Sequence, residues 1–443
     1  MPSQFRITSL ALWILLAPLA WGESRTLTII HTNDLHGHIQ QTEEFAGAAR
    51  IAALVDQARA TQPGVLVLDA GDSISGTPVS TLFKGVPIFA ILNRVGYNAG
   101  ALGNHEFDHG FRQIALFRDT AGYPLINANV TTRDGTLLAD DTSLVMQVNG
   151  IRIAIIGILT DQTPQLITPI GNAGLEFQSP ETQLRARVDS LDPFVDLVLV
   201  LSHVGHEEEK RLAAAINNID VIIGGHSHTR VSPAVKINDT YVVQAGFYGS
   251  HVGYLELTVD TQQQKLLNFA GQLIAAKDLP PPDPFVAGLV ASWEQAVADI
   301  VDVEIYRSER DYSREELQPI IEAILASYTG ADFGFYNKGG IRDRIRSGLL
   351  SIRHLWNLEP FGNSLVTVTA LGADIRSLLS MEGEQHWRLS TLNDDQIYTV
   401  ATNSFVAAQV SKASPELFKI EDSGQLVRDV LVEHISSHGL PVD

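Results

Sequence analysis

The chain has 443 residues, of which 45% are hydrophobic and 19% are charged, so it is long enough to form at least two hydrophobic cores. Its 51 Asp and Glu residues outnumber its 31 Lys and Arg residues, and the formal net charge of −20 disfavours binding to nucleic acid polymers or to anionic membranes. An anionic substrate must therefore be attracted by cations placed close to it. The absence of cysteine excludes disulfides, thiolate metal ligands and cysteine nucleophiles.

Residues 1–22 have the composition of a signal peptide. Arg6 precedes an apolar run from Leu10 to Ala20, which is short for a membrane span, and Trp21-Gly22 completes a pattern typical of signal-peptidase cleavage. We therefore expect cleavage near Gly22 and a periplasmic or secreted protein without stable membrane insertion. An uncleaved N-terminal anchor is the alternative. Without cysteine, the processed N-terminus has no acceptor for lipid attachment.

Short apolar strands, polar loops and helical stretches alternate from about Leu27 to Ala275, which predicts an α/β domain. The strands are mostly continuous apolar runs, as expected for strands that helices bury on both faces. Seven are predicted, at Thr26–His31, Val65–Asp69, Ala99–Gly103, Pro124–Ala128, Ile151–Ile158, Leu197–Ser202 and Val221–Ile223. Several run directly into polar clusters. Because open α/β sheets bind ligands at the carboxyl ends of their strands, we expect these clusters to share one crevice.

Three prolines at residues 280–282 interrupt this pattern. A helix-like segment, Phe285–Asp299, follows them and leads to a second region from about Val301. We therefore predict a first domain at residues 23–278, a linker helix at 279–300 and a second domain at 301–443.

The first two polar clusters offer carboxylates to a metal. HTNDLHGH at residues 31–38 places Asp34 and His36 just beyond a strand, where a carboxylate oxygen and an imidazole nitrogen can face one cation. GDSISG at 71–76 presents Asp72 in a glycine-flanked turn, where its carboxylate can bridge two cations. Taken singly, the first cluster is also explained by a solvated loop and the second by a turn-forming or helix-capping Asp.

The third cluster, GNHEFDHG at 103–110, brings three polar groups into one loop. Asn104 can bind a metal through its amide oxygen, whereas His105 is available to hydrogen-bond an oxyanion or to protonate a leaving group. Asp108 can orient His105 and raise its basicity. A set of surface polar residues is the simpler alternative for this loop alone.

Histidines mark the last two clusters, LSHVGH at 201–206 and IIGGHSHT at 222–229. We expect His203, His226 and His228 to be metal ligands. His206 precedes three glutamates at an apparent helix start, which favours a solvated role, and the role of His251 stays open. Five such clusters after five strands are poorly explained by chance, so together they predict one metal centre.

The five blocks together resemble the signature motifs of calcineurin-like metallophosphoesterases, specifically the 5′-nucleotidase branch. This resemblance implies an N-terminal α/β-sandwich metallophosphoesterase domain and a second, smaller α/β substrate-binding domain. It also implies two divalent cations that lower the pKa of an attacking water. We expect zinc or manganese, and the donor types suit iron as well. The implied ligands are Asp34, His36 and His228 for one ion, Asn104, His203 and His226 for the other, and Asp72 as the bridge. His105 and Asp108 match the family's catalytic pair.

Two blocks of the second domain, YNKGGIRDR at 336–344 and EPFGN at 359–363, resemble substrate-binding segments of 5′-nucleotidases. Arg342 is the expected phosphate ligand, since a guanidinium can clamp a phosphate through two hydrogen bonds. Asn337 is expected to support the nucleoside. Phe361 and Phe405 match the two aromatic residues between which the family holds a nucleobase, and such stacking tolerates different bases.

Two features leave the substrate open. Arg310 and Arg314 both lie near the position of a further phosphate-binding Arg in the family. The family also continues after the second aromatic with a Gly-Gly-Asp segment whose acid contacts the nucleoside, whereas this chain continues with AAQVSKASPE from Ala407. The absence of this acid puts recognition of the base or ribose in question.

We therefore expect a hydrolase that releases phosphate from nucleoside 5′-monophosphates, with a nucleotide or another small organic phosphate as its partner. Hydrolysis of 2′,3′-cyclic nucleotides or of nucleotide sugars is the main alternative. A sulfate thiohydrolase and a non-catalytic nucleotide-binding protein are more distant alternatives. The oligomeric state is not indicated by the sequence.

Overall fold

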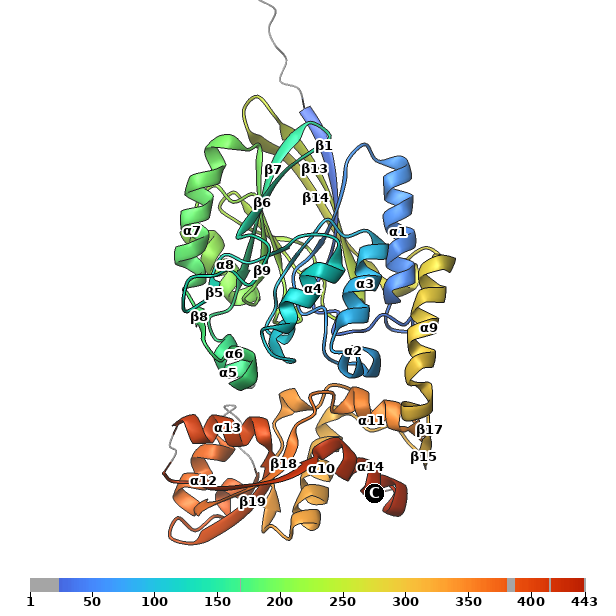
Figure 1. The fold of residues 1–443 in the computed structure, drawn as a ribbon, viewed down its shortest axis with the longest axis vertical. Helices are drawn as coiled ribbons and strands as arrows, with labels where there is room; N and C mark the ends of the chain where they lie inside the picture. The colour runs from blue at the N-terminus through green and yellow to red at the C-terminus, as the bar shows by residue number, and fades with distance from the viewer. Residues whose placement is uncertain (1–23, 168, 381–386, 414–415, 442–443) are drawn as a thin grey trace, which may run out of the picture.

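The structure, a computed structural model, describes residues 24–441 except residues 168, 381–386 and 414–415 (Figure 1). The expected signal peptide, residues 1–22, lies outside the described residues. Within the described part of the chain, none of the helices has the length and the apolar content of a membrane span.

Two six-stranded sheets form the centre of the N-terminal region. The first has the strand order β14-β13-β1-β2-β3-β4, and the second has the order β11-β12-β10-β9-β7-β6. Strands β1 to β4 are parallel, as are β7, β9, β10 and β12. The first sheet contains β1 Ser24–Thr32, β2 Val65–Asp69, β3 Ala99–Ala101, β4 Leu125–Ile126, β13 His251–Asp260 and β14 Lys265–Ala275. The second contains β6 Ser143–Val148, β7 Ile151–Leu159, β9 Leu197–His203, β10 Val221–Gly224, β11 Val235–Ile237 and β12 Thr240–Val243.

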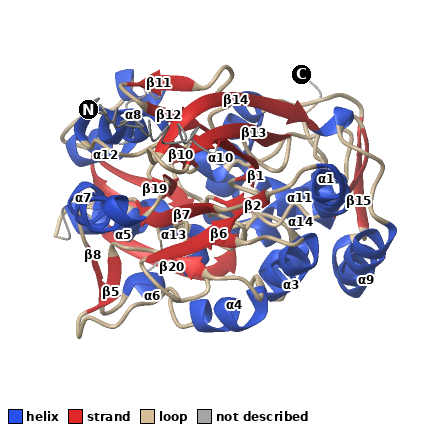
Figure 2. Ribbon diagram, turned by 90° about the horizontal axis from the view of Figure 1, so that it is seen from above, coloured by secondary structure: helices blue, strands red, loops and turns tan. Residues whose placement is uncertain are grey.

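The two sheets pack face to face and helices cover their outer faces. Ile29 and Leu68 of the first sheet share one buried apolar cluster with Ile153 and Leu199 of the second. Helices α1 (Gly47–Thr61), α3 (Val86–Val95) and α4 (Gln113–Ala121) cover the first sheet, and α7 (Pro180–Leu191) and α8 (His206–Ala215) cover the second. Figure 2 shows α1 and α7 on opposite sides of the strands.

The seven predicted strands are confirmed as β1, β2, β3, β4, β7, β9 and β10. The expectation that helices cover both faces of each sheet is wrong, because the opposite sheet covers the inner face. Adjacent residues show why the sequence pattern is the same in both cases: Ile29 is buried between the sheets, whereas Ile30 is buried under helices. The predicted strand Ala99–Gly103 is also too long. β3 ends at Ala101, and the Gly103 amide donates instead to the Glu106 carboxylate at 2.6 Å.

The predicted helix after the prolines is confirmed as α9, Pro284–Val301, which connects the two parts of the molecule (Figure 1). The Asp283 carboxylate caps it by accepting a hydrogen bond from the Val286 amide at 2.8 Å, and a proline occupies its first turn. Val290 and Val297 belong to the same buried cluster as residues of α1 and α3. The apolar side of α9 is thus packed on the N-terminal region.

The C-terminal region has three layers. Its central sheet has the order β16-β19-β18-β20, with α10 and α14 on one face and α12 and α13 on the other. Its elements are β15 Glu304–Ser308, α10 Arg314–Thr329, β16 Phe333–Gly334, β17 Gly348–Ser351, α11 Ile352–Leu358, β18 Ser364–Leu371, α12 Gly372–Leu379, β19 Ile397–Asn403, α13 Ser404–Ala413, β20 Lys419–Leu426 and α14 Val427–His438.

Smaller elements of the N-terminal region are α2 Pro78–Leu82, β5 Val130–Thr132, α5 Thr163–Leu166, α6 Pro169–Asn172 and β8 Leu175–Phe177. The mixed α/β class is as predicted.

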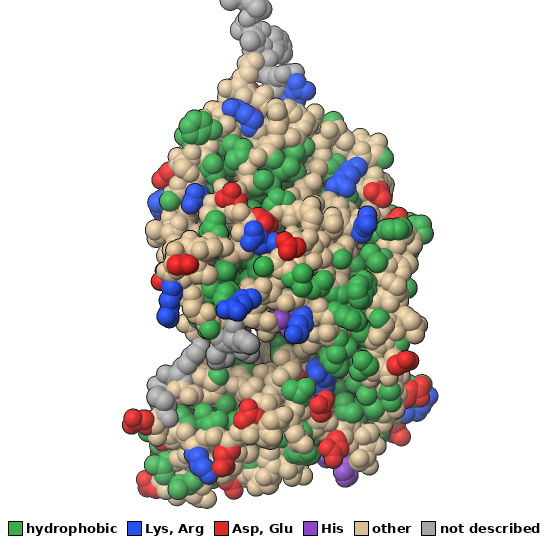
Figure 3. Space-filling model, viewed as in Figure 1, with side chains coloured by type: hydrophobic (Ala, Val, Ile, Leu, Met, Phe, Trp, Pro, Cys, Tyr) green, Lys and Arg blue, Asp and Glu red, His purple; other side chains and the backbone are tan. Residues whose placement is uncertain are grey.

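The loops that follow β1, β2, β3, β9 and β10 carry the five polar clusters. These loops lie at the junction with the C-terminal region, where side chains from both parts line one cavity. Figure 3 shows the surface narrowing at this junction, where basic side chains and a histidine side chain reach the surface.

Candidate metal centre

Left-handed backbone conformations are concentrated in the polar loops. Asp34, His36, Asp72, His226 and His228 all have positive φ, between 48° and 75°. Such a conformation costs a non-glycine residue about 1–3 kcal/mol and persists only where the surroundings enforce it. Its presence at five of the seven predicted ligands is typical of a functional site.

Backbone hydrogen bonds between loops continue the order of the sheet beyond the strand ends. The Asp34 amide donates to the Gly71 carbonyl at 2.9 Å, and the His36 amide donates to the Asp72 carbonyl at 2.9 Å. Because these bonds satisfy buried backbone groups, the first two loops are held together as firmly as the strands they follow.

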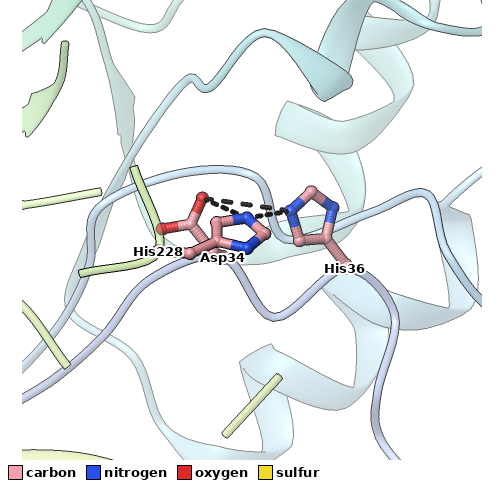
Figure 4. A group of neighbouring side chains, drawn as sticks. All are labelled: Asp34, His36 and His228. Atoms are coloured by element: carbon pink, nitrogen blue, oxygen red, sulfur yellow. Dashed lines mark hydrogen bonds and ion pairs between the residues drawn. The ribbon is translucent and has the colours of Figure 1, made fainter. Parts of the chain in front are cut away.

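The first group of side chains consists of Asp34, His36 and His228 (Figure 4). The Nε2 atoms of His36 and His228 are 3.1 Å apart, and His228 Nε2 is 3.4 Å from Asp34 Oδ1. His36 Nδ1 lies 3.0 Å from the Ser75 carbonyl, which can only accept, so this nitrogen carries the hydrogen and Nε2 carries a lone pair. Two imidazole nitrogens and a carboxylate oxygen thus face one point, which fits a divalent cation.

The second group consists of Asp72, His203 and His226 and has Asn104 beside it. His203 Nδ1 donates to the Ala70 carbonyl at 2.7 Å, so its buried Nε2 presents a lone pair to Asp72 Oδ2 at 3.1 Å. A lone pair against a carboxylate is repulsive unless a proton or a cation lies between them. Asn104 Oδ1 lies 2.9 Å from His226 Nδ1, which completes a mixed oxygen and nitrogen donor set.

Asp72, a member of the second group, also faces His36 of the first group. Its Oδ1 accepts a hydrogen bond from the His105 amide at 2.8 Å, which leaves Oδ2 to face the histidines. This single oxygen is 3.1 Å from His203 Nε2 and 3.8 Å from His36 Nε2. The structure therefore brings all seven predicted ligands together, with Asp72 in the position that a bridge requires.

Two of the predicted histidine ligands are held neutral by burial, whereas His203 is influenced more strongly by two carboxylates. Burial lowers the pKa of His36 well below its ordinary value and lowers the pKa of His226 to about 4, so both imidazoles are neutral, as metal binding requires. Burial alone would also lower the pKa of His203, but Asp72 and Asp34 outweigh burial and raise it to about 10. The buried carboxylates thus favour a positive charge beside them, which a divalent cation can supply.

His105 and Asp108 form the predicted pair. His105 Nδ1 lies 2.7 Å from Asp108 Oδ2, so this nitrogen donates and the carboxylate accepts. Burial alone would lower the pKa of His105, but Asp108 and Asp72 outweigh it and raise the pKa to about 9. Protonated His105 can therefore donate from Nε2 to an oxyanion beside the metal groups.

A cavity of about 320 Å³ connects the metal groups with the C-terminal region. This volume suits a small organic ligand. Its N-terminal side is lined by Asp72, Asn104, His105, Asp108, Leu166, Ile167, His226 and His228. Its C-terminal side is lined by Asn337, Gly339, Gly340, Arg342, Phe361, Asn363 and Phe405. All four predicted substrate-binding residues thus line the same cavity as the metal groups.

Arg342 reaches across the junction to the metal groups. Its Nε donates to the Tyr248 hydroxyl at 3.2 Å, and its Nη2 is 3.4 Å from His36 Nε2. The Phe361 ring lies 5.5 Å from the guanidinium carbon and stacks on His105 with a centroid distance of 5.6 Å. A guanidinium in this place can bind the phosphoryl group of a substrate held at the metals.

Asn337 and Phe405 are positioned by one polar contact. The Asn337 side-chain oxygen accepts a hydrogen bond from Asn403 Nδ2 at 2.8 Å, and Asn403 Oδ1 in turn accepts from the Val406 amide at 2.9 Å. This chain of bonds fixes the start of α13, which carries Phe405, relative to the loop that carries Asn337.

The two upstream arginines differ in their surroundings. Arg310 forms an ion pair with Glu316 at 2.7 Å and lies over the Tyr312 ring at 4.0 Å, away from the metal groups. Arg314 donates to the Arg342 carbonyl at 2.5 Å and lines an adjoining groove with Arg342. Of the two arginines, Arg314 is thus the one that contacts the Arg342 segment.

The two undecided histidines lie outside both metal groups. The expected solvated role of His206 is wrong, because its side chain is only 13% exposed and its Nδ1 is 3.9 Å from the buried carboxylate of Glu209. His251 lines the same adjoining groove as Arg314, and burial lowers the pKa of His251. Neither histidine is among the described residues that form the candidate metal groups.

The lining or supporting residues that were not predicted include Asn363, Tyr248, Leu166 and Ile167. Tyr248 stacks on His38 at 3.8 Å and holds Arg342, and its only sequence signal is a pair of nearby turn glycines. Leu166 and Ile167 form an apolar wall opposite the C-terminal region. Nothing in the sequence distinguishes them from other apolar loop residues.

Two family models match the chain. Residues 27–230 match the family model of the calcineurin-like phosphoesterases, and residues 295–391 match that of the 5′-nucleotidase C-terminal domain. The chain belongs to the 5′-nucleotidase family. Within this family, Protein UshA of Yersinia enterocolitica is 27% identical over 439 residues, covering 84% of this chain and 80% of that protein. Human 5′-nucleotidase is 32% identical over 388 residues, covering 79% and 64%.

Solved structures show the same architecture. The 5′-nucleotidase precursor of Thermus thermophilus is 26% identical and superposes with a TM-score of 0.84, covering 93% of this chain and 96% of that one. The sulfate thiohydrolase SoxB of Thermus thermophilus shares the fold at 18% identity and a TM-score of 0.81, which shows likeness of fold alone. Membership of the 5′-nucleotidase family identifies the chain as a metal-dependent phosphoric ester hydrolase.

Proposed function

We propose that this enzyme hydrolyses nucleoside 5′-monophosphates to nucleosides and inorganic phosphate at a centre of two divalent cations, zinc or manganese. One observation carries the proposal: a single cavity is lined by four of the seven predicted ligands, Asp72, Asn104, His226 and His228, together with Arg342, Phe361 and Phe405. The names of the relatives, 5′-nucleotidases from several organisms, support the same substrate class.

The proposed ligands divide between two ions. Asp34, His36 and His228 would hold one, and Asn104, His203 and His226 would hold the other. Asp72 would contribute to both through Oδ2, since this oxygen faces histidines of both groups. Bound there, two divalent cations would supply a water of lowered pKa and Lewis acidity towards the phosphoryl oxygens.

The remaining residues would act on the phosphoryl group and the leaving oxygen. Arg342 would bind the phosphoryl oxygens and hold the phosphorus in line with the attacking water. His105 would donate a proton from Nε2 to the leaving 5′ oxygen as the phosphorus–oxygen bond breaks, with Asp108 holding the imidazole through Nδ1. The products are then a neutral nucleoside hydroxyl and inorganic phosphate.

The leaving group would occupy the end of the cavity formed by Phe361, Phe405, Leu166 and Ile167. These apolar side chains suit a flat, uncharged ring, and stacking on aromatic side chains accommodates every nucleobase. Asn337 offers the nucleoside a polar contact at the same end.

The decisive assay is phosphate release from AMP by purified protein, first stripped of metal and then supplied with zinc or manganese. We expect metal-dependent release, and its loss in His105→Ala with retained AMP binding. Absence of metal-dependent release from every nucleotide tested would refute the proposal. Because the acid that contacts the nucleoside in the family is missing after Phe405, the same assay should also include 2′,3′-cyclic AMP and UDP-glucose as substrates.

We also propose that residues 1–22 are a cleavable signal peptide and that the mature enzyme is periplasmic or secreted. We further propose that the metal domain spans residues 23–278, the linker residues 279–300 and the substrate domain residues 301–443. Mass spectrometry of the mature protein from a bacterial host tests the cleavage site, since an intact Met1 would contradict export by cleavage.

A further inference from the structure

The carboxylate of Glu106 is buried among backbone amides of two metal loops. Its side chain lies in the one-turn helix His105–Phe107, and the residue is 1% exposed. Oε2 accepts hydrogen bonds from Gly103 N at 2.6 Å and Asp72 N at 3.0 Å. Oε1 accepts from Ser73 N at 2.9 Å and from Ile74 N at 3.4 Å. One carboxylate therefore binds amides from residues 72–74 and from residue 103.

The two loops are joined in both directions. The Glu106 carboxylate accepts from the Asp72 amide, and the Asp72 carboxylate accepts from the His105 amide at 2.8 Å. The contact between the loops is also tight, because a Cβ at Gly103 would lie 2.2 Å from Asp72 Oδ1. The separation of Asp72 and Asn104 is consequently set by these paired bonds.

The loop that carries Asp72 needs such an anchor. Gly71, Asp72 and Ser75 have positive φ, and the amides of three successive residues turn inward to the same carboxylate. Convergent backbone amides of this kind form an anion-binding concavity. A buried amide left without an acceptor is destabilising, so acceptor atoms at this place are required for the loop conformation.

We propose that Glu106 is a positioning residue that fixes Asp72 relative to Asn104 and thereby sets the affinity of the second metal ion. The inference rests on the proposed two-metal centre. Glu106 does not face the cavity, since it is absent from the lining and all of its hydrogen bonds go to backbone amides. It acts through the geometry of Asp72 and Asn104.

A glutamine at this position has nearly the same shape but half of the accepting groups. Its amide oxygen can replace one carboxylate oxygen, whereas its NH₂ group would face two backbone N–H donors. Either the amides of residues 72 and 103 or those of residues 73 and 74 would lose their acceptor. The loops would then separate in the E106Q variant without any change to a metal ligand.

The test is titration of Mn²⁺ into metal-free protein, followed by calorimetry and by the spin-coupled signal of a manganese pair in electron paramagnetic resonance. In E106Q we expect the second Mn²⁺ to bind about 10- to 100-fold more weakly, as is usual when a group behind the ligands is lost. The spin-coupled signal should weaken, and high Mn²⁺ should restore it. The metal-free variant should melt earlier than the metal-free wild-type protein, because two buried amides lose their acceptor, so the Mn²⁺ affinity and not the melting temperature decides the test.

Asp220→Asn is the matched control. Asp220 is also a carboxylate that accepts a backbone hydrogen bond, from Val198 N at 2.8 Å, but it lies before β10, at the opposite end of this strand from His226. This variant should bind both Mn²⁺ ions as the wild-type protein does.

The outcomes separate the inference from the proposed function. A wild-type protein that binds fewer than two Mn²⁺ ions overturns the two-metal proposal and this inference with it. A wild-type protein that binds two, alongside an E106Q variant of equal affinity or one that only melts earlier, overturns the role of Glu106 alone. If E106Q does not fold, the affinity for the second Mn²⁺ ion is measured in Glu106→Asp instead. This variant keeps both carboxylate oxygens on a shorter side chain, and its affinity decides the role of Glu106 in the same way.

Discussion

Replacing Arg342 by lysine would keep a positive charge beside the metal groups but remove the planar pair of donors. In the structure, one side of the guanidinium is used by the Tyr248 hydroxyl at 3.2 Å, and Nη2 points towards His36, where the phosphoryl group would lie. A lysine can offer a single ammonium to the phosphate and cannot bind Tyr248 at the same time in this geometry.

The expected loss follows from the bonds removed. One hydrogen bond to a charged group contributes about 1.5–3 kcal/mol, so losing one phosphoryl contact should lower kcat/KM by about 10- to 150-fold. Tyr248→Phe removes only the bond that orients the guanidinium, and a smaller decrease of about 2- to 10-fold is expected because a phosphate still receives both donors.

Steady-state hydrolysis of AMP at saturating metal measures these effects, with Arg310→Lys as the matched control. Arg310 is paired with Glu316 outside the cavity, so its substitution should leave kcat/KM within about twofold of the wild-type value. If Arg342→Lys retained wild-type kcat/KM, or if Arg310→Lys were impaired as strongly, the placement of the phosphate beside Arg342 would be wrong.

Three further predictions concern the metals and the surrounding fold. A chelator should abolish activity and lower the melting temperature, because metal at 100 times its Kd adds about 2.7 kcal/mol to the folded state, and zinc or manganese should restore both. Gly224→Ala should destabilise the protein by about 1–3 kcal/mol in thermal unfolding, since the new Cβ would lie 2.2 Å from the buried Glu209 carboxylate, whereas Gly288→Ala, with open space around it, should not. Burial raises the pKa of Asp220 to about 6, so the folded state binds this proton more tightly than the unfolded state and stability is lost as pH rises from about 4 to about 6. Asp220→Asn should accordingly be more stable than the wild-type protein by about 1–3 kcal/mol at pH 7.5 and equally stable at pH 4, and equal stability at both pH values would contradict the assigned burial effect.

The sequence was most informative where strands end in polar loops. Val65–Asp69 is predicted as a strand and coincides with β2 because a parallel strand buried on both faces needs a continuous apolar run. Asp72 and Asn104 follow such strands directly, so their convergence could be inferred before their distances were known. Short-range chemistry at strand ends was therefore predictable from residue types and spacing.

Contacts made across the layers were not predictable in the same way. An apolar run such as Leu197–Ser202 is the same whether a helix or a second sheet covers it, so the sandwich came only from the family resemblance. His206 shows the same limit, because its neighbouring glutamates suggested solvent, yet Glu209 turns inward and is buried. Arg310 and Arg314 could be separated only by their partners in the structure.

The missing acid after Phe405 has a structural counterpart. In place of a Gly-Gly-Asp segment, α13 continues as a helix to Ala413, and Gln409 on this helix donates to the Gln165 carbonyl of α5. This contact joins α5 to α13, and Leu166 of α5 and the adjacent Ile167 line the cavity. Leu166, Ile167, Phe361 and Phe405 form an apolar enclosure at this end of the cavity.

This enclosure predicts weak discrimination at the ribose. Among the described residues that line the cavity, the two carboxylates are Asp72 and Asp108, and both already face histidines at the metal end. A site that hydrogen-bonds a substrate hydroxyl rejects the analogue lacking it by about 10⁴-fold or more, whereas an apolar pocket does not. AMP and 2′-deoxy-AMP should therefore have kcat/KM values within about tenfold of each other, as competition between the two nucleotides in one reaction would measure. A preference for AMP of a thousandfold would show that a polar side chain, such as Asn337 or Asn363 of the lining, reads the 2′-hydroxyl, and the apolar account of the leaving-group end would have to be abandoned.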